Sequence, residues 1–308
     1  MPRILTLPRK LTCGNCTFAV FALCAATAIT VSAQTLTTLH SFDGTDGQYP
    51  EGALVQAANG HLYGATEEGG ANSDGTLFNV TRPGALTSLY SFCSQSNCSD
   101  GAFPGYMTLV GATNGDVYGT TINGGFGVGT VFKMTLSGAI TTLYSFCSVS
   151  NCADGITPYA GLVQATNSDL YGTTEAGGAN GGGGTVFKIT PKGTLTTLYS
   201  FCAQSGCADG SSPWAGLVQA TNGDLYGTTT AGGANGGGTV FKITPSGAFT
   251  TLYSFCALSN CTDGKLPYGG LIEASNGDLY GTTGEGGTSL YYGTIFKITL
   301  GGTLTTLY

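Results

Sequence analysis

The chain has 308 residues, of which 52 are glycine, and Asp, Glu, Lys and Arg together supply only 9%. This composition excludes a coiled coil or a helical repeat, because those folds need charged surfaces and few glycines. A content of 41% apolar residues also excludes a disordered chain. The net charge of −7 lacks the Lys and Arg surplus that phosphate binding needs, so no nucleic-acid partner is expected.

The first 33 residues differ in composition from the rest of the chain. Basic residues at Arg3, Arg9 and Lys10 precede an apolar run that ends in small residues at Ala33. This order predicts a signal peptide over 1–33 and a secreted or cell-surface protein. An N-terminal membrane anchor is the competing interpretation. The apolar run is shorter than the roughly 20 residues that span a bilayer, so no membrane span is expected in the mature chain.

Residues 34–308 contain one sequence unit repeated five times. A Leu-Tyr-Ser-Phe phrase or a close variant recurs every 50 to 55 residues, and three other phrases recur between its copies in constant order. One unit shows them at 216–220, 224–229, 238–244 and 248–255. Each phrase is short, rich in β-branched and aromatic residues and bounded by turn residues, which predicts a β-strand. The predicted units are 35–88, 89–142, 143–197, 198–251 and 252–308.

Four strands in about 54 residues are typical of one propeller blade, so we predict an all-β fold, a β-propeller of about five four-stranded blades. Short Asn-Gly-Asp and Pro-x-Gly segments alternate with Gly-rich and inter-unit loops along the chain. In an up-and-down sheet, alternate connections emerge at the same end. Both kinds of long loop therefore share one face, where we expect ligand binding.

Eight of the 11 cysteines lie in the inter-unit loops as four pairs with constant spacing. The pairs are Cys93/Cys98, Cys147/Cys152, Cys202/Cys207 and Cys256/Cys261. We interpret them as four local disulfides formed in an oxidising compartment. Metal binding is the alternative, but two-ligand pairs without nearby His do not complete a tetrahedral site. No metal and no cofactor are expected.

The repeated phrases resemble a known family. The segment Leu36–Gly47, the Pro-Tyr-Ala-Gly-Leu-Val phrase at 158–163, the Leu-Tyr-Gly-Thr-Thr phrase at 170–174 and the Gly-Thr-Val-Phe-Lys-Ile-Thr-Pro phrase at 184–191 are similar to the GloVer tandem repeat. That repeat typifies bacterial "choice-of-anchor" surface proteins. The resemblance covers about 35–308 and implies an exported or surface-displayed, propeller-like repeat protein. It implies no reaction.

Charged residues that recur in every unit are better explained by folding than by a single site. Asp46 and its equivalents, each followed by Gly, are expected to form side-chain-to-backbone turn bonds. The equivalents are Asp100, Asp154, Asp209 and Asp263, while a second set at the tight turns is Asp116, Asp169, Asp224 and Asp278, and the third strands carry Lys133, Lys188, Lys242 and Lys297. All three sets are expected to be structural.

The inventory of catalytic residues is small. The only histidines are His40 and His61, and neither a serine-nucleophile elbow nor a zinc-protease motif occurs. We therefore assign no catalytic residue. Carboxylates at non-repeating positions keep a glycosidase or lyase open as the alternative, although the sequence does not fix the separation that a carboxylate pair requires. They are Glu51, Glu175, Glu273 and Glu285.

Aromatic residues offer the best binding candidates. Tyr159, Trp214 and Tyr268 follow the loop proline at equivalent places, Tyr106 lies near that place in the second unit, and Tyr291-Tyr292 is an insertion in a Gly-rich loop. If the first strands line a central channel, these rings gather at its mouth and can stack on sugars. Alternatively, each ring fills the seam between two blades.

Two function classes remain. The first is a non-catalytic scaffold or ligand-binding module whose partner is a glycan or a surface protein. The second is an extracellular carbohydrate-active enzyme. A sixth copy of the fourth-strand phrase, at 35–42, leaves two structural alternatives: five blades with an additional edge strand, or a longer chain with further repeats. Because an unpaired edge strand promotes aggregation, the second alternative is favoured.

Overall fold

The computed structural model of the protein describes residues 36–104, 109–289 and 291–308. The chain divides into two units, Met1–Thr38 and Leu39–Tyr308, and all described strands belong to the second. The predicted signal peptide falls outside the described residues.

The strands form five antiparallel sheets of four, each joined in chain order. We call these sheets blades 1 to 5. Blade 1 contains β1 (Val55–Gln56), β2 (Leu62–Thr66), β3 (Thr76–Val80) and β4 (Leu86–Ser91). Blade 2 contains β5 (Val110–Gly111), β6 (Val117–Thr121), β7 (Thr130–Met134) and β8 (Ile140–Ser145). Blade 3 contains β9 (Val163–Gln164), β10 (Leu170–Thr174), β11 (Thr185–Ile189) and β12 (Leu195–Ser200). Blade 4 contains β13 (Val218–Gln219), β14 (Leu225–Thr229), β15 (Thr239–Ile243) and β16 (Phe249–Ser254). Blade 5 contains β17 (Ile272–Glu273), β18 (Leu279–Thr283), β19 (Thr294–Ile298) and β20 (Leu304–Thr306).

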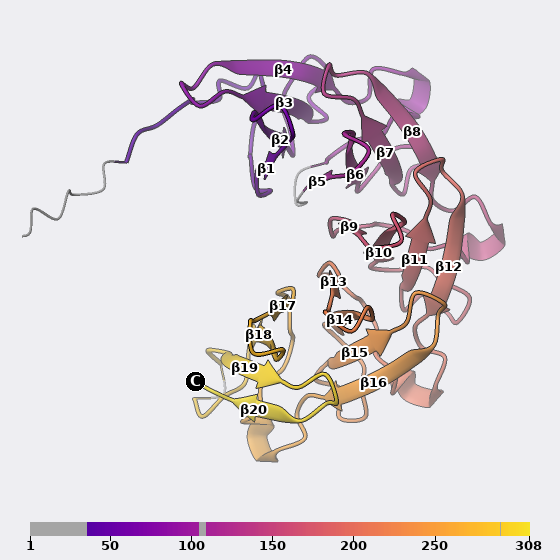
Figure 1. Ribbon diagram of the computed structural model, residues 1–308. Helices are drawn as coiled ribbons and strands as arrows, with labels where there is room; N and C mark the ends of the chain where they lie inside the picture. Colours follow the sequence, from indigo (N-terminus) through magenta and orange to yellow (C-terminus); the bar gives the residue numbers. More distant parts are fainter. Residues whose placement is uncertain (1–35, 105–108, 290) are drawn as a thin grey trace, which may run out of the picture. The chain divides into compact units, whose positions relative to one another are not determined.

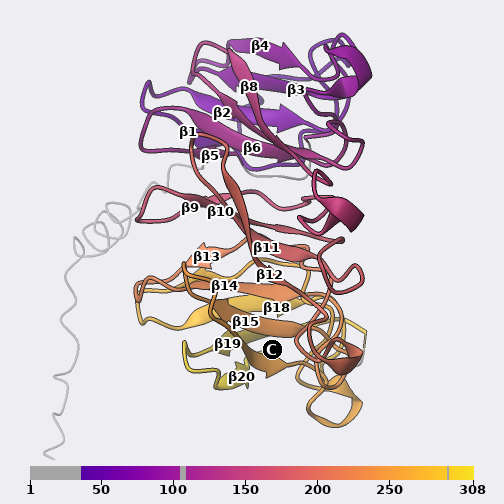
Figure 2. The ribbon, with the colours of Figure 1, turned by 90° about the vertical axis from the view of Figure 1, so that its right-hand side faces the viewer.

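The fold is all-β and consists of four-stranded propeller blades, as the repeated phrases predict. In Figure 1 the blades of the second unit follow one another in chain order, with the first strand of each on the inner side and the fourth on the outer side. Four short 3₁₀ helices lie between consecutive blades: η1 (Ser96–Cys98), η2 (Ser150–Cys152), η3 (Ser205–Cys207) and η4 (Ser259–Cys261). Figure 2 shows the short helices gathered at one side, the side of the long loops.

The hydrophobic core lies between blades rather than within them. Four clusters of buried residues each join two consecutive blades. In one of them Tyr171, Val186 and Phe201 from blade 3 and the loop that follows it pack against Leu225 and Phe241 of blade 4. A single sheet buries its apolar face only against a neighbour, so each blade depends on the adjacent blades for its stability.

The second strand of each blade contains a glycine that makes room for this core. At Gly172 an added Cβ would lie 2.6 Å from the ring of Phe187 and 2.9 Å from Leu162. Phe187 in turn meets Phe146, at the end of the preceding blade, edge to face with ring centroids 5.2 Å apart. The glycine is therefore required by the close approach of a phenylalanine ring.

The loops between blades are fixed by disulfides and by a buried carboxylate. All four predicted cysteine pairs are bonded. Asp100 is fully buried and accepts hydrogen bonds from the backbone N–H groups of Ser94 and Gln95, as predicted for a turn aspartate. It also accepts a bond from the hydroxyl of Tyr90 on β4, which the sequence analysis did not foresee.

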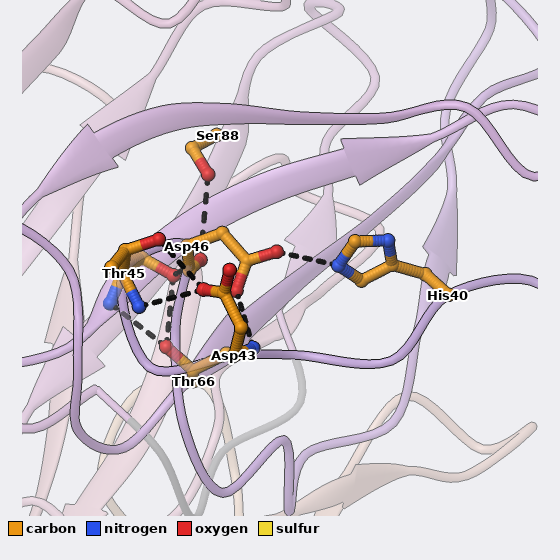
Figure 3. A network of polar contacts seen from close by, with 7 residues as sticks. His40, Asp43, Thr45, Asp46, Thr66 and Ser88 are labelled. Carbon is orange, nitrogen blue, oxygen red and sulfur yellow. Dashed lines mark hydrogen bonds and ion pairs between the residues drawn. The ribbon is translucent and has the colours of Figure 1, made fainter.

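The loop before blade 1 has no cysteines and is held by side-chain hydrogen bonds instead (Figure 3). Asp46 accepts a hydrogen bond from the backbone N–H of Asp43 and contacts the His40 ring. Asp43 accepts bonds from the hydroxyl and the backbone N–H of Thr45, and these bonds hold the pKa of Asp43 below its ordinary value. His40 thus takes the place that Tyr90 has in the following loop.

Candidate functional site

Three aromatic side chains from consecutive blades line one pocket of about 440 Å³. Tyr159 precedes β9 in blade 3, Trp214 precedes β13 in blade 4, and Tyr268 precedes β17 in blade 5. The pocket is also lined by small residues and leucines that follow each ring, such as Gly216 and Leu217. The structure therefore brings together the three aromatic residues that the sequence places at equivalent positions.

A proline and a threonine position each ring. The residue before the proline has a positive φ, 54° at Ser212, and this turn of the chain comes just before Trp214 and the inner strand β13. The carbonyl of Ala215 then accepts a hydrogen bond of 3.1 Å from the buried hydroxyl of Thr173 in blade 3. Thr228 of blade 4 makes the corresponding bond, 3.4 Å long, to the carbonyl of Gly269, and it also reaches the carbonyl of Pro267 at 3.3 Å.

Each ring is thus held by a threonine of the preceding blade. This role of the threonines was not predicted from the sequence. The sequence feature that could have revealed it is the Thr-Thr pair in the second strand of a blade. Consecutive strand residues point to opposite faces, so one threonine of each pair turns towards the next blade.

Trp214 contacts both tyrosine rings, while Trp214 and Tyr268 stay open to solvent. Tyr159 and Trp214 are stacked, with centroids 4.8 Å apart and an interplanar angle of 14°. Tyr268 meets Trp214 edge to face at 5.6 Å. Trp214 is still 39% exposed and Tyr268 50% exposed. The rings therefore contribute to the seams between blades and also present an aromatic surface.

Carboxylates give this aromatic cluster an acidic border. The indole Nε1–H of Trp214 donates a 3.1 Å hydrogen bond to Oε1 of Glu175, which follows β10. Burial, and then the negative charges of Glu175 and Glu67, raise the pKa of Tyr159. Tyr159 also lines a second hollow of about 280 Å³ together with Glu67 and Asn123. Hydrogen-bond acceptors therefore lie on the side of the cluster that faces blades 1 to 3.

The other aromatic candidates do not join this pocket. Tyr106 lies outside the described residues. Tyr291 and Tyr292 are 73% and 87% exposed. Tyr292 lines a separate hollow with Leu307 and Tyr308, and that hollow shares no lining residue with the aromatic pocket.

The remaining carboxylate candidates are also not brought together. Glu273 accepts hydrogen bonds from the backbone N–H and hydroxyl of Thr221, and Glu285 forms an ion pair of 2.8 Å with Lys265. Glu51 occupies in blade 1 the position that Trp214 has in blade 4. Among the described residues no carboxylate lines the aromatic pocket itself, and Glu175 reaches it only through the indole of Trp214.

The recurring charged residues have structural partners. Each lysine of the third strands lies 3.4 to 3.9 Å from the aspartate of the neighbouring tight turn, as Lys242 does from Asp224. In the described part of the chain, the one close group of metal-ligand types is Asp74 with Cys93 and Cys98. Those two sulfurs are joined in a disulfide, so they are not thiolate ligands. No helix in the described ranges has the length and apolar character needed to cross a membrane.

Comparisons with known proteins agree with the repeat pattern. The family model of the Gloeobacter/Verrucomicrobia repeat matches residues 24–207 and 150–308. No curated protein matches the chain.

Solved structures resemble the fold at low identity. A putative 6-phosphogluconolactonase from Bacteroides uniformis is 15% identical, with a TM-score of 0.46 and coverage of 84% of both chains. A putative oxidoreductase (glucose dehydrogenase) from Thermus thermophilus is 15% identical, with a TM-score of 0.47 and coverage of 85% of this chain and 83% of the other. A putative exo-β-1,3-galactanase from Bifidobacterium bifidum is 11% identical, with a TM-score of 0.44 and coverage of 83% and 89%. Similarity at this level carries no argument about activity.

Proposed function

The chain belongs to the Gloeobacter/Verrucomicrobia repeat family, and we propose that it is an exported, non-catalytic module that binds carbohydrate in the aromatic pocket of blades 3 to 5. The convergence of Tyr159, Trp214 and Tyr268 on one pocket is the observation that carries this proposal.

The chemistry of the pocket suits a sugar ring. The C–H face of a pyranose stacks on exposed aromatic rings, and Trp214 and Tyr268 both offer such a surface. Glu175, close to the indole edge, can accept hydrogen bonds from sugar hydroxyls. A volume of about 440 Å³ lies within the range of roughly 300–1,000 Å³ that small-molecule sites occupy. One or two sugar units would fill it.

A binding role is favoured over a glycosidase role by the positions of the carboxylates. Hydrolysis of a glycoside needs two carboxyl groups on opposite sides of the scissile bond. Glu273 and Glu285 are instead engaged in bonds outside the pocket, and Glu175 has the indole of Trp214 as its partner.

Export is supported by the four disulfides between blades. Local disulfides of this number persist in oxidising compartments and are rare in the reducing cytosol. An extracellular location would also expose the pocket to polysaccharides, whose chain ends and branches match a site of this size.

The test uses Trp214 as its own reporter, since it is the only tryptophan in the chain. Binding of a sugar on the indole is expected to change its emission, and titration with a panel of oligosaccharides gives the affinity. Tyr268→Ala should weaken binding by about tenfold or more, equivalent to about 1.4 kcal/mol.

Phe126→Ala is the matched control, because Phe126 is 68% exposed but does not line the pocket. Its affinity should equal that of the unchanged protein. Equal binding by the Tyr268 variant would contradict the proposal. Release of reducing ends from a bound oligosaccharide would favour the enzyme instead.

A further inference from the structure

One face of blade 5 is exposed where the same face of every other blade is buried. Ile295 on β19 is 47% exposed, whereas its equivalents Leu77, Val131, Val186 and Val240 are fully buried. Likewise Tyr280 is partly exposed, although the equivalent tyrosine is completely buried in the other four blades. In those blades the residues pack against the blade that follows. Figure 1 shows blades 1 and 5 at the two ends of the series.

The polar groups on this face also differ from their equivalents in the other blades. Thr282 corresponds to Thr173 and Thr228, which donate to backbone carbonyls of the next blade, yet within the described ranges it has no such acceptor and is exposed. The carbonyl of Gly237 accepts a hydrogen bond from the N–H of Leu266 in the next blade. Tyr292 holds the equivalent position in blade 5. Blade 5 thus presents both the apolar and the polar half of a blade-to-blade interface.

The complementary end of the series carries a fragment of such an interface. Phe42, which precedes blade 1, meets Phe78 of β3 with ring centroids 5.1 Å apart at 64°. The pairs Phe92–Phe132, Phe146–Phe187, Phe201–Phe241 and Phe255–Phe296 have centroids 5.2 to 5.3 Å apart at 60° to 68°. Residues Leu39–Phe42 therefore occupy the place of the end of a fourth strand from a blade that would precede blade 1.

We infer that the exposed face of blade 5 is a docking surface for one further copy of this repeat, bound as a three-stranded segment that uses Leu39–Phe42 as its fourth strand. The four interfaces within the protein define the chemistry of this occupant. The occupant presents two leucines, a phenylalanine and an isoleucine to blade 5. Blade 4 presents the same set to blade 3, as Leu217, Leu225, Phe241 and Ile243. The occupant also supplies the Pro-x-x-x-Leu segment whose carbonyls accept the Thr282 hydroxyl.

The docked segment would also change the aromatic pocket. In the docked segment, the residue after the loop proline would lie beside Tyr268, at the place that corresponds to that of Tyr268 beside Trp214. The docking inference rests on the blade interfaces alone and stands independently of carbohydrate binding.

The test adds the inferred occupant to the full chain. A copy of residues 200–244, which carries the inter-blade loop and three strands of blade 4, is fused directly after Tyr308. The added segment is expected to resist proteolysis and to show slow amide hydrogen exchange. The melting temperature is expected to rise by about 5 °C. The matched control is a fusion of the same residues in shuffled order.

Two substitutions locate the segment. In the extended chain Ile295→Asp and, separately, Phe42→Ala should abolish the protection of the added segment. Ile295→Asp should leave the melting temperature of the original chain unchanged, because the side chain is exposed there, whereas Val240→Asp buries a charge and lowers it steeply.

Two outcomes would overturn the inference. One is an added segment that exchanges its amides as fast as the shuffled control. The other is dimerisation of the original chain, followed by sedimentation and abolished by Ile295→Asp, which would assign the face to a second copy of the whole protein instead.

Discussion

The hydroxyl of Tyr90 donates a hydrogen bond of 2.6 Å to Oδ2 of Asp100, ten residues further along the chain. The same bond, 2.8 Å long, joins Tyr144 to Asp154, Tyr199 to Asp209 and Tyr253 to Asp263. It connects the end of each fourth strand to the loop that leads into the next blade. The stability of the loop and that of the strand are therefore linked.

Removal of this bond should destabilise the protein. Tyr90→Phe deletes the hydroxyl and leaves one oxygen of a buried carboxylate with fewer donors, which is expected to lower the free energy of unfolding by about 1.5 kcal/mol. Urea denaturation measures the change. Tyr291→Phe, at an exposed ring, serves as the control and should have no effect.

The same pair predicts a loss of stability at high pH. Burial, followed by the hydrogen bond to Asp100, raises the pKa of Tyr90 to about 12 from an ordinary value of 10.0. A pKa that is higher in the folded than in the unfolded state contributes stability below pH 10, and this contribution is lost as the pH rises towards 12. Melting temperatures measured from pH 9 to 12 should therefore fall less for Tyr90→Phe than for the unchanged protein.

At low pH the carboxylate of the pair acts in the opposite sense. Burial alone would raise the pKa of Asp100, but hydrogen bonds from Tyr90 and Ser94 hold it below the ordinary value of 3.8. Stability from Asp100 is thus present above pH 3.8 and is lost as the pH falls through the lower, folded-state pKa. Acid unfolding of Asp100→Asn, followed by circular dichroism, should lack this component. An unchanged acid transition would contradict the assignment.

The second-strand glycines should not tolerate a methyl group. Gly172→Ala places a Cβ 2.6 Å from the Phe187 ring, and overpacking of this kind is expected to cost about 1–3 kcal/mol. Gly111→Ala is the matched control, because its Cβ would meet only Val55 at an ordinary 3.5 Å. Thermal melting of both variants distinguishes the two positions, and equal losses would show that the contact with Phe187 yields at little cost.

Reduction of the disulfides should lower stability in proportion to the number removed. Each closes a loop of about six residues, so the chain-entropy model gives a loss of about 2 kcal/mol per bond. The double variant Cys202→Ala/Cys207→Ala tests one bond, with denaturation of the oxidised protein as the reference. A much smaller loss would mean that the buried Asp209, through its bonds to Tyr199 and the loop backbone, holds the loop without help.

The sequence was sufficient to predict the strands and the disulfides because both depend on local spacing that is repeated five times. It also placed Tyr159, Trp214 and Tyr268 together, since equivalent positions in successive blades must lie at the same end. The bond between Trp214 and Glu175 was not predictable. It joins residues 39 positions apart in different blades, and only the packing of blade against blade decides which side chains meet.

The shared interfaces between consecutive blades have an evolutionary consequence. Every interface uses the same residue types, so recombination between repeats can add, delete or exchange a whole blade without disrupting the contacts on either side. The position after the loop proline, occupied by Glu51, Tyr159, Trp214 and Tyr268, varies among blades while the interface residues keep their character. The residue at this position can therefore change one blade at a time on a scaffold that stays constant.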